Sequence, residues 1–130
     1  MIVGVGLDLV EIARVGRLLD RHGSRAMARF FTSAEAAYAR THAHPARHLA
    51  ARIAAKEAAY KALSGGGTAA RAIGWTEIEV VAQAGASPTL VFHARAAQVV
   101  EALGVESWLL TLTHTDTTAA AVVLLESAWR

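Results

Sequence analysis

The sequence predicts an α+β fold, in which an antiparallel sheet packs with a long central helix and shorter helices. Three observations support this prediction. The chain has 130 residues, a length that suits a single domain spanning residues 1–130. Apolar residues alternate with a period of two near the N-terminus, take helical spacing in the middle, and mostly alternate again toward the C-terminus. One strand, then helices, then mainly strands is typical of α+β domains with antiparallel sheets.

The first predicted strand covers residues 2–10 and has two unlike faces. One face is entirely apolar, and we expect it to pack on the core. It consists of Val3, Val5, Leu7 and Leu9. The other face carries Gly4, Gly6 and Asp8. Because glycine weakens a strand, this pair indicates that another part of the molecule approaches the backbone closely. Asp8 taken alone is either a turn or cap residue or a functional carboxylate.

Helical spacing begins at Ile12, and the first helix is expected to end at residues 22–24, where the sequence is His-Gly-Ser. The exposed side of this helix carries three arginines at spacings of three and four. They are Arg14, Arg17 and Arg21. Residues at these spacings are neighbours on a helix surface. The row is either a solvated face or a docking surface.

A second, shorter helix is expected to run to about Thr41. Thr32 or Ser33 can cap its start, and Glu35 follows Thr32 at the spacing of a capping box. The segment His-Ala-His-Pro at residues 42–45 breaks the helix. Its two histidines could bind a metal, but without a third ligand nearby we interpret them as loop residues.

The longest predicted helix covers residues 47–64, is rich in alanine, and is followed by three glycines that stop it. Four larger apolar residues give it a stripe. They are Leu49, Ile53, Tyr60 and Leu63. Glu57 and Lys61 lie one turn apart on the same face. Without further context, this pair is an ordinary surface ion pair worth about 0.3–0.5 kcal/mol.

The second half of the chain predicts four strands and one helix. The strands cover residues 77–81, 90–92, 107–113 and 119–125. The helix covers residues 94–103 and ends at Gly104. Residues 114–118, His-Thr-Asp-Thr-Thr, are expected to form a hairpin loop between the last two strands.

Charge is distributed unevenly, although the net charge is only +2. Residues 1–65 hold ten basic and five acidic side chains, whereas residues 66–130 hold three and six. The basic half predicts an acidic partner. No apolar run approaches the ~18 residues of a membrane span, and the chain has no cysteine. We therefore expect a cytoplasmic protein that does not bind a membrane.

Three sequence motifs are informative when taken together: Gly-x-Asp ending at Asp8, Ala-Ala-Lys-Glu-x-x-x-Lys over residues 54–61, and Leu-Thr-His-Thr over residues 112–115. With Phe-Thr-x-x-Glu at residues 31–35, they closely resemble the holo-acyl-carrier-protein synthases, the short 4′-phosphopantetheinyl transferases. The resemblance covers nearly the whole chain. Two positions depart from the pattern, since Ile53 replaces an aromatic residue and Ala-Ser-Pro at 86–88 replaces a Gly-Lys-Pro turn.

This resemblance implies transfer of phosphopantetheine from coenzyme A to a serine of apo acyl carrier protein, with release of 3′,5′-ADP, as in fatty acid or polyketide biosynthesis. The implied catalytic residues are Asp8, Glu57 and Lys61. Asp8 and Glu57 match the family's Mg²⁺ ligands, and Mg²⁺ prefers carboxylates, phosphates and water. The ammonium of Lys61 would neutralise phosphate charge. The implied coenzyme contacts are Arg52, Lys61, Gly65, Pro88, His114 and Thr115.

The resemblance also implies partners. The acidic carrier protein would dock on the arginine row, Arg14 above all. The chain has the length of the short branch of the family, which implies a homotrimer with active sites at subunit interfaces. Three alternatives stay open: a magnesium-dependent coenzyme A phosphohydrolase, an inactive coenzyme-binding relative, and a basic binding module. Nucleic acid is disfavoured, because only 6% of the residues are aromatic and we expect no exposed aromatic residues interleaved with the basic ones.

Overall fold

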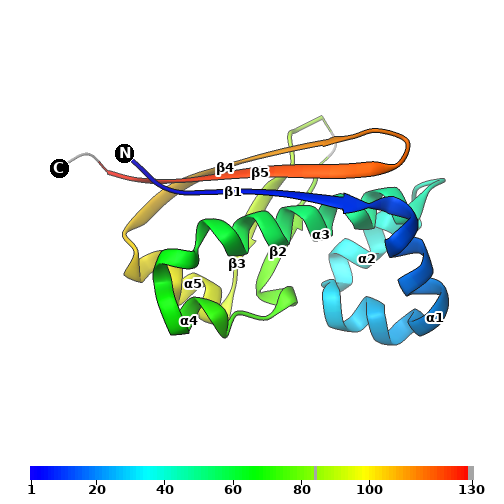
Figure 1. Ribbon diagram of the computed structural model, residues 1–130, viewed down its shortest axis with the longest axis horizontal. Helices are drawn as coiled ribbons and strands as arrows, with labels where there is room; N and C mark the ends of the chain where they lie inside the picture. The colour runs from blue at the N-terminus through cyan, green and yellow to red at the C-terminus, as the bar shows by residue number, and fades with distance from the viewer. Residues whose placement is uncertain (84, 129–130) are drawn as a thin grey trace.

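The chain's two ends meet in a three-stranded antiparallel sheet (Figure 1). The computed structural model describes residues 1–83 and 85–128. In spatial order, the strands of this sheet are β1 (Ile2–Glu11), β5 (Thr118–Ser127) and β4 (Val105–His114). A separate two-stranded antiparallel sheet pairs β2 (Ile78–Val81) with β3 (Thr89–Phe92). The antiparallel sheets of the α+β prediction are thus confirmed.

A long central helix, α3 (Pro45–Ala62), runs beneath the three-stranded sheet (Figure 1). At one end of α3 lie α1 (Ile12–Phe30) and α2 (Ser33–Arg40), and at the other end lie α4 (Gly67–Arg71) and α5 (Ala94–Ala102). Short 3₁₀ turns cover Ser64–Gly66 and Trp75–Glu77. None of the helices in the described residues is long and apolar enough to cross a membrane.

Glycine and alanine let β1 and α3 come into direct backbone contact. A Cβ atom on Gly6 would lie 1.7 Å from the carbonyl oxygen of Ala58, and one on Gly4 would lie 2.3 Å from that of Ala62. Both distances are far below van der Waals contact, so only glycine fits at either position. The close approach predicted for this strand is therefore present, and its partner is the central helix.

This packing reverses the predicted orientation of β1. The apolar face that was expected in the core points away from α3, and its side chains are exposed in the single chain. They are Val3, Val5, Leu7 and Leu9. The face predicted to be less apolar is the packed one, because alanine backbone rather than large side chains fills the space against it.

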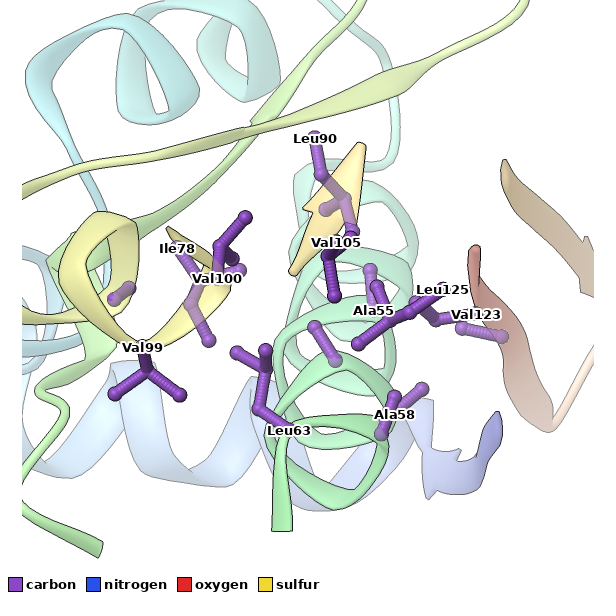
Figure 2. Packing of buried hydrophobic residues seen from close by; sticks show 14 of the residues in the cluster. Ala55, Ala58, Leu63, Ile78, Leu90, Val99, Val100, Val105, Val123 and Leu125 are labelled. Atoms are coloured by element: carbon purple, nitrogen blue, oxygen red, sulfur yellow. The ribbon is translucent and has the colours of Figure 1, made fainter. Parts of the chain in front are cut away.

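The main core lies between α3, the sheets and α5 (Figure 2). In Figure 2, Ala58 of α3 and Leu63, the residue that follows α3, lie near valines and leucines from the strands and from α5. Leu63, Leu125 and Val123 are among its fully buried side chains. A second cluster joins α1 and α2 to the other end of α3, through Val15, Phe31, Ala39, Leu49, Ala50 and Ala119. Of the predicted stripe on α3, Leu49 and Leu63 are buried, and Ile53 and Tyr60 are half-buried.

Two helical segments differ from the sequence prediction. The helix expected to end at residues 22–24 only kinks there, because Gly23 takes a positive φ of 47° and helical structure resumes up to Phe30. The three glycines after α3 form a 3₁₀ turn that leads into α4, which the sequence did not predict.

The capping box of α2 is confirmed, since Thr32 and Glu35 exchange both hydrogen bonds. The predicted hairpin is confirmed as well: the backbone N–H of Thr115 donates to the carbonyl oxygen of Thr118 at 2.8 Å.

Candidate functional site

Strand β1 and helix α3 bring together the three residues predicted to be catalytic. The ammonium of Lys61 donates to Oδ1 of Asp8 at 2.9 Å and to the carbonyl oxygen of Leu7 at 3.0 Å. The side chain of Lys61 is 51% exposed and that of Asp8 is 18% exposed, so a ligand can reach both. Asp8 and Glu57 line one cavity of about 1010 Å³, here called the Asp8 cavity.

The two carboxylates repel each other. Burial and the negative charge of Asp8 raise the pKa of Glu57, whereas Lys61 opposes the rise. A divalent cation between such carboxylates would relieve this repulsion, and Mg²⁺ commonly takes one or two carboxylates and completes its shell with water and phosphate. Within residues 1–83 and 85–128, no group of three or more His, Cys, Asp or Glu side chains could hold a metal ion. Two carboxylates on facing elements fit Mg²⁺, which takes its remaining ligands from water and substrate phosphates.

The arginine row of α1 borders the same cavity. Arg14, Arg17 and Arg21 all line the Asp8 cavity and are all exposed. Apolar side chains close another part of its wall, including Phe30 and Trp75, whose rings meet edge to face at 5.0 Å. No pattern in the sequence indicated these aromatic residues, because they lie 45 positions apart and meet only in the fold.

A buried ion pair holds α3 in place at the residue before Glu57. The ammonium of Lys56 contacts Glu35 at 2.8 Å and donates to the carbonyl oxygen of Trp75 at 2.9 Å. Glu35 in turn accepts from the backbone N–H of Val80 at 2.9 Å. Burial lowers the pKa of Lys56, and Glu35 opposes that effect. This network ties α2, α3 and β2 together beside the candidate site, and the sequence indicated only its capping box.

A second groove, of about 200 Å³, gathers three of the predicted coenzyme contacts and is here called the Arg52 groove. Its wall contains Arg52, Pro88 and His114. Arg52 is only 3% exposed, and its Nε atom has no hydrogen-bond partner within the described part of the chain. Its guanidinium carbon lies 4.2 Å from the ring centroid of Tyr38. A buried cation with an unused donor beside a groove is suited to bind an anion.

The Asp8 cavity and the Arg52 groove share no lining residue. Arg52 and Glu57 are five positions apart on α3, which places them about 140° apart around the helix axis. Asp8 and His114 lie on β1 and β4, the two outer strands of the sheet, with β5 between them. One chain therefore does not bring the predicted nucleotide contacts next to the predicted catalytic residues.

The last two predicted contacts lie outside both linings. Thr115 is exposed in the hairpin beside His114, and its hydroxyl oxygen accepts from the backbone N–H of Thr118 at 3.1 Å. Gly65 lies in the turn after α3 and is exposed.

Comparison with known proteins gives a consistent result. A family model described as the 4′-phosphopantetheinyl transferase superfamily matches residues 4–122. A holo-[acyl-carrier-protein] synthase of Koribacter versatilis is 42% identical over 127 residues, covering 97% of this chain and 99% of the relative. The chain therefore belongs to the 4′-phosphopantetheinyl transferase superfamily, which confirms the resemblance found in the sequence.

Solved structures agree with this assignment. The holo-[acyl-carrier-protein] synthase of Neisseria meningitidis superposes with a TM-score of 0.84 at 28% identity, covering 98% of this chain and all of that one. The enzyme of Bacillus anthracis, described in complex with CoA (3′,5′-ADP), superposes with a TM-score of 0.77 at 30% identity, covering 98% and 99%. These superpositions confirm the predicted fold class.

Proposed function

We propose that this protein transfers the 4′-phosphopantetheine group of coenzyme A to a serine of apo acyl carrier protein, in the cytoplasm, and releases 3′,5′-ADP. The observation that carries the proposal is the grouping of Asp8, Glu57 and Lys61 at an arginine-lined cavity, in a chain that belongs to this superfamily. The relatives' printed names, holo-[acyl-carrier-protein] synthase, support the same reaction.

The residues supply what phosphoryl transfer needs. The serine oxygen bonds to the phosphorus that bears pantetheine, the bond from that phosphorus to the 5′-phosphate oxygen of 3′,5′-ADP breaks, and the serine proton passes to a base or to solvent. Asp8 and Glu57 would hold Mg²⁺, which when bound neutralises charge on the diphosphate oxygens. Lys61 would add a further positive charge beside Asp8, which would stabilise negative charge on the phosphate oxygens. Preorganised charge of this kind is the main contribution that a protein makes to such a reaction.

We further propose that the coenzyme's nucleotide lies in the Arg52 groove of a neighbouring subunit, so that a homotrimer completes each active site. Two features support this. The predicted nucleotide contacts and catalytic residues face different cavities in one chain. The outer face of the three-stranded sheet is also apolar and exposed: Val5 is 58% exposed, and the aligned row continues through Leu124 to Leu109. An exposed apolar face of this kind favours association with another copy.

The acidic carrier protein would bind to the arginine row of α1. Arg14, Arg17 and Arg21 line the Asp8 cavity, so a carrier protein bound to them would lie beside Asp8 and Glu57. Exposed charges of this kind mainly raise the association rate and fix the docking register, and salt screens them.

Intact-mass spectrometry of apo acyl carrier protein incubated with coenzyme A, Mg²⁺ and this protein tests the proposal. We expect the carrier to gain one phosphopantetheine group in the complete reaction. We expect no gain with EDTA, with Asp8→Asn or with Glu57→Gln, and normal transfer with Glu101→Gln, a matched change on the exposed side of α5. Release of 3′,5′-ADP without a heavier carrier would instead identify a coenzyme A phosphohydrolase. Binding of coenzyme A with neither product would identify an inactive relative.

A further inference from the structure

Two histidines and a tyrosine stack beside the Arg52 groove. The ring of His42 lies 4.4 Å from that of Tyr38 and 4.1 Å from that of His48, measured between centroids. Tyr38 and His48 also meet edge to face at 5.7 Å. Tyr38 and His48 line the groove, whereas His42 lies behind them and holds its Nδ1 atom 2.8 Å from the carbonyl oxygen of Tyr38. The stack fixes His48 at the groove wall, one helical turn before Arg52.

The titratable groups that act on His48 are arginines and other histidines. Arg47 and Arg52 approach it on α3, His42 from the preceding loop, and His114 from β4. Glu35 on α2, the carboxylate that acts on Arg52, is already paired with Lys56. The opposite wall, from the segment between β2 and β3, contributes the uncharged Gln83 and Pro88. Burial lowers the pKa of His48, and His42 and Arg52 lower it further.

A phosphate in the groove would oppose the lowering of the His48 pKa. Arg52 in the groove wall already has one buried donor, Nε, without an acceptor in residues 1–83 and 85–128. A phosphate bound there would meet the imidazole of His48 across the same small space, and its negative charge would favour the imidazolium form. The proton would come from solvent, because the groups nearest to His48 are guanidinium groups, imidazoles and a tyrosine rather than carboxylic acids.

We propose that His48 is a phosphate ligand of the Arg52 groove and binds its anion as the imidazolium, so that the nucleotide and one proton are taken up together. The inference rests on the proposed function, because the nucleotide is that of coenzyme A. It adds a residue that the motifs do not contain, since His48 lies outside every segment on which the family resemblance depends. It also gives coenzyme binding a dependence on pH in the neutral range, stronger at lower pH.

Calorimetric titration of the full-length protein with 3′,5′-ADP tests the inference. Titrations at one pH in two buffers of different ionisation enthalpy give the number of protons taken up. We expect the wild type to take up about half a proton more than His48→Phe near neutral pH. We also expect His48→Phe, which keeps an aromatic ring in the stack, to bind about tenfold more weakly at pH 6, as for loss of one charge-assisted hydrogen bond. The phosphate's own titration is common to both proteins and cancels in the difference.

The controls separate this inference from the proposed function. His93→Phe changes a histidine that lines neither the Asp8 cavity nor the Arg52 groove, so its proton uptake should equal that of the wild type. Equal proton uptake by His48→Phe and the wild type would overturn the inference and leave the proposed function intact. Absence of 3′,5′-ADP binding by every protein, the wild type included, would count against the proposed function itself. If His48→Phe does not fold, NMR of the wild-type His48 ring decides, and a ring that stays neutral with 3′,5′-ADP bound at pH 6 overturns the inference.

Discussion

Replacing Gly6 by alanine tests whether the contact between β1 and α3 brings Asp8 together with Glu57 and Lys61. The new Cβ atom would lie 1.7 Å from the carbonyl oxygen of Ala58 and 2.6 Å from its carbonyl carbon. Both obstacles are helix backbone, so no side-chain rotation relieves them, and strand and helix must separate by about 1.3 Å or more. We expect a cost of about 3 kcal/mol or more, which corresponds to a fall in Tm of roughly 10 °C. Transfer activity should fall by more than the loss of folded protein explains, because the same separation moves Asp8 away from Glu57 and Lys61.

Thermal unfolding followed by circular dichroism and the mass-spectrometric transfer assay measure the two effects. Gly16→Ala on α1 is the matched control, because its Cβ atom comes no closer than 4.0 Å to the side chain of Ala46. We expect that variant to gain about 0.5–1 kcal/mol of stability, as for glycine to alanine in a helix. Ala58→Gly should not rescue Gly6→Ala, because the clash is with a main-chain oxygen. A Tm for Gly6→Ala within 2 °C of the wild type, or rescue by Ala58→Gly, would refute the reasoning.

Three further predictions concern other parts of the proposed site. The pKa of Glu57 is raised in the folded state. At pH values just above the ordinary pKa range of glutamate, the folded protein therefore binds more protons than the unfolded chain, and its stability falls as the pH rises. Glu57→Gln should flatten that fall and raise Tm at pH 7 by about 1–2 °C in calorimetry. Val5→Glu places a charge on the exposed apolar face, so light scattering should show monomers. Their transfer activity should be under about a tenth of that of the wild type. In steady-state assays, Arg17→Glu should raise the KM for carrier protein about tenfold and leave kcat unchanged. The rise in KM should be smaller at high salt, because salt screens exposed charges.

Much of the fold follows from local patterns in the sequence. The capping box at Thr32 and Glu35, the hairpin after His114 and the alanine-rich helix are local signals, and the structure contains all three. The continuation of α1 beyond Gly23 was not predictable from such signals. A glycine with positive φ can end a helix or merely kink it, and packing of Met27 and Phe30 against the second core cluster decides the outcome.

Spacing alone predicts the candidate site only where its residues share a short segment, and the grouping of Asp8 with Glu57 followed from the family resemblance instead. Glu57 and Lys61 are one turn apart, so their common face follows from helix geometry. The Arg52 groove joins α2, α3, β4 and the segment between β2 and β3. No spacing in the sequence indicates that Tyr38, His48 and His114 converge, because their proximity depends on how three separate elements pack.

The reversed orientation of β1 links the proposed catalytic residues to the proposed assembly. Residues alternate across a strand, so turning Gly6 and Asp8 toward α3 necessarily turns Val5 and Leu7 outward. The contact that brings Asp8 within 2.9 Å of Lys61 thus also creates the apolar face that a neighbouring copy would cover. Hydrophobicity alone favours the opposite orientation in a single chain, since it would bury Val5 and Leu7. Burial of these side chains between subunits would recover that free energy, which is why we expect the loss of assembly and the loss of transfer to occur together.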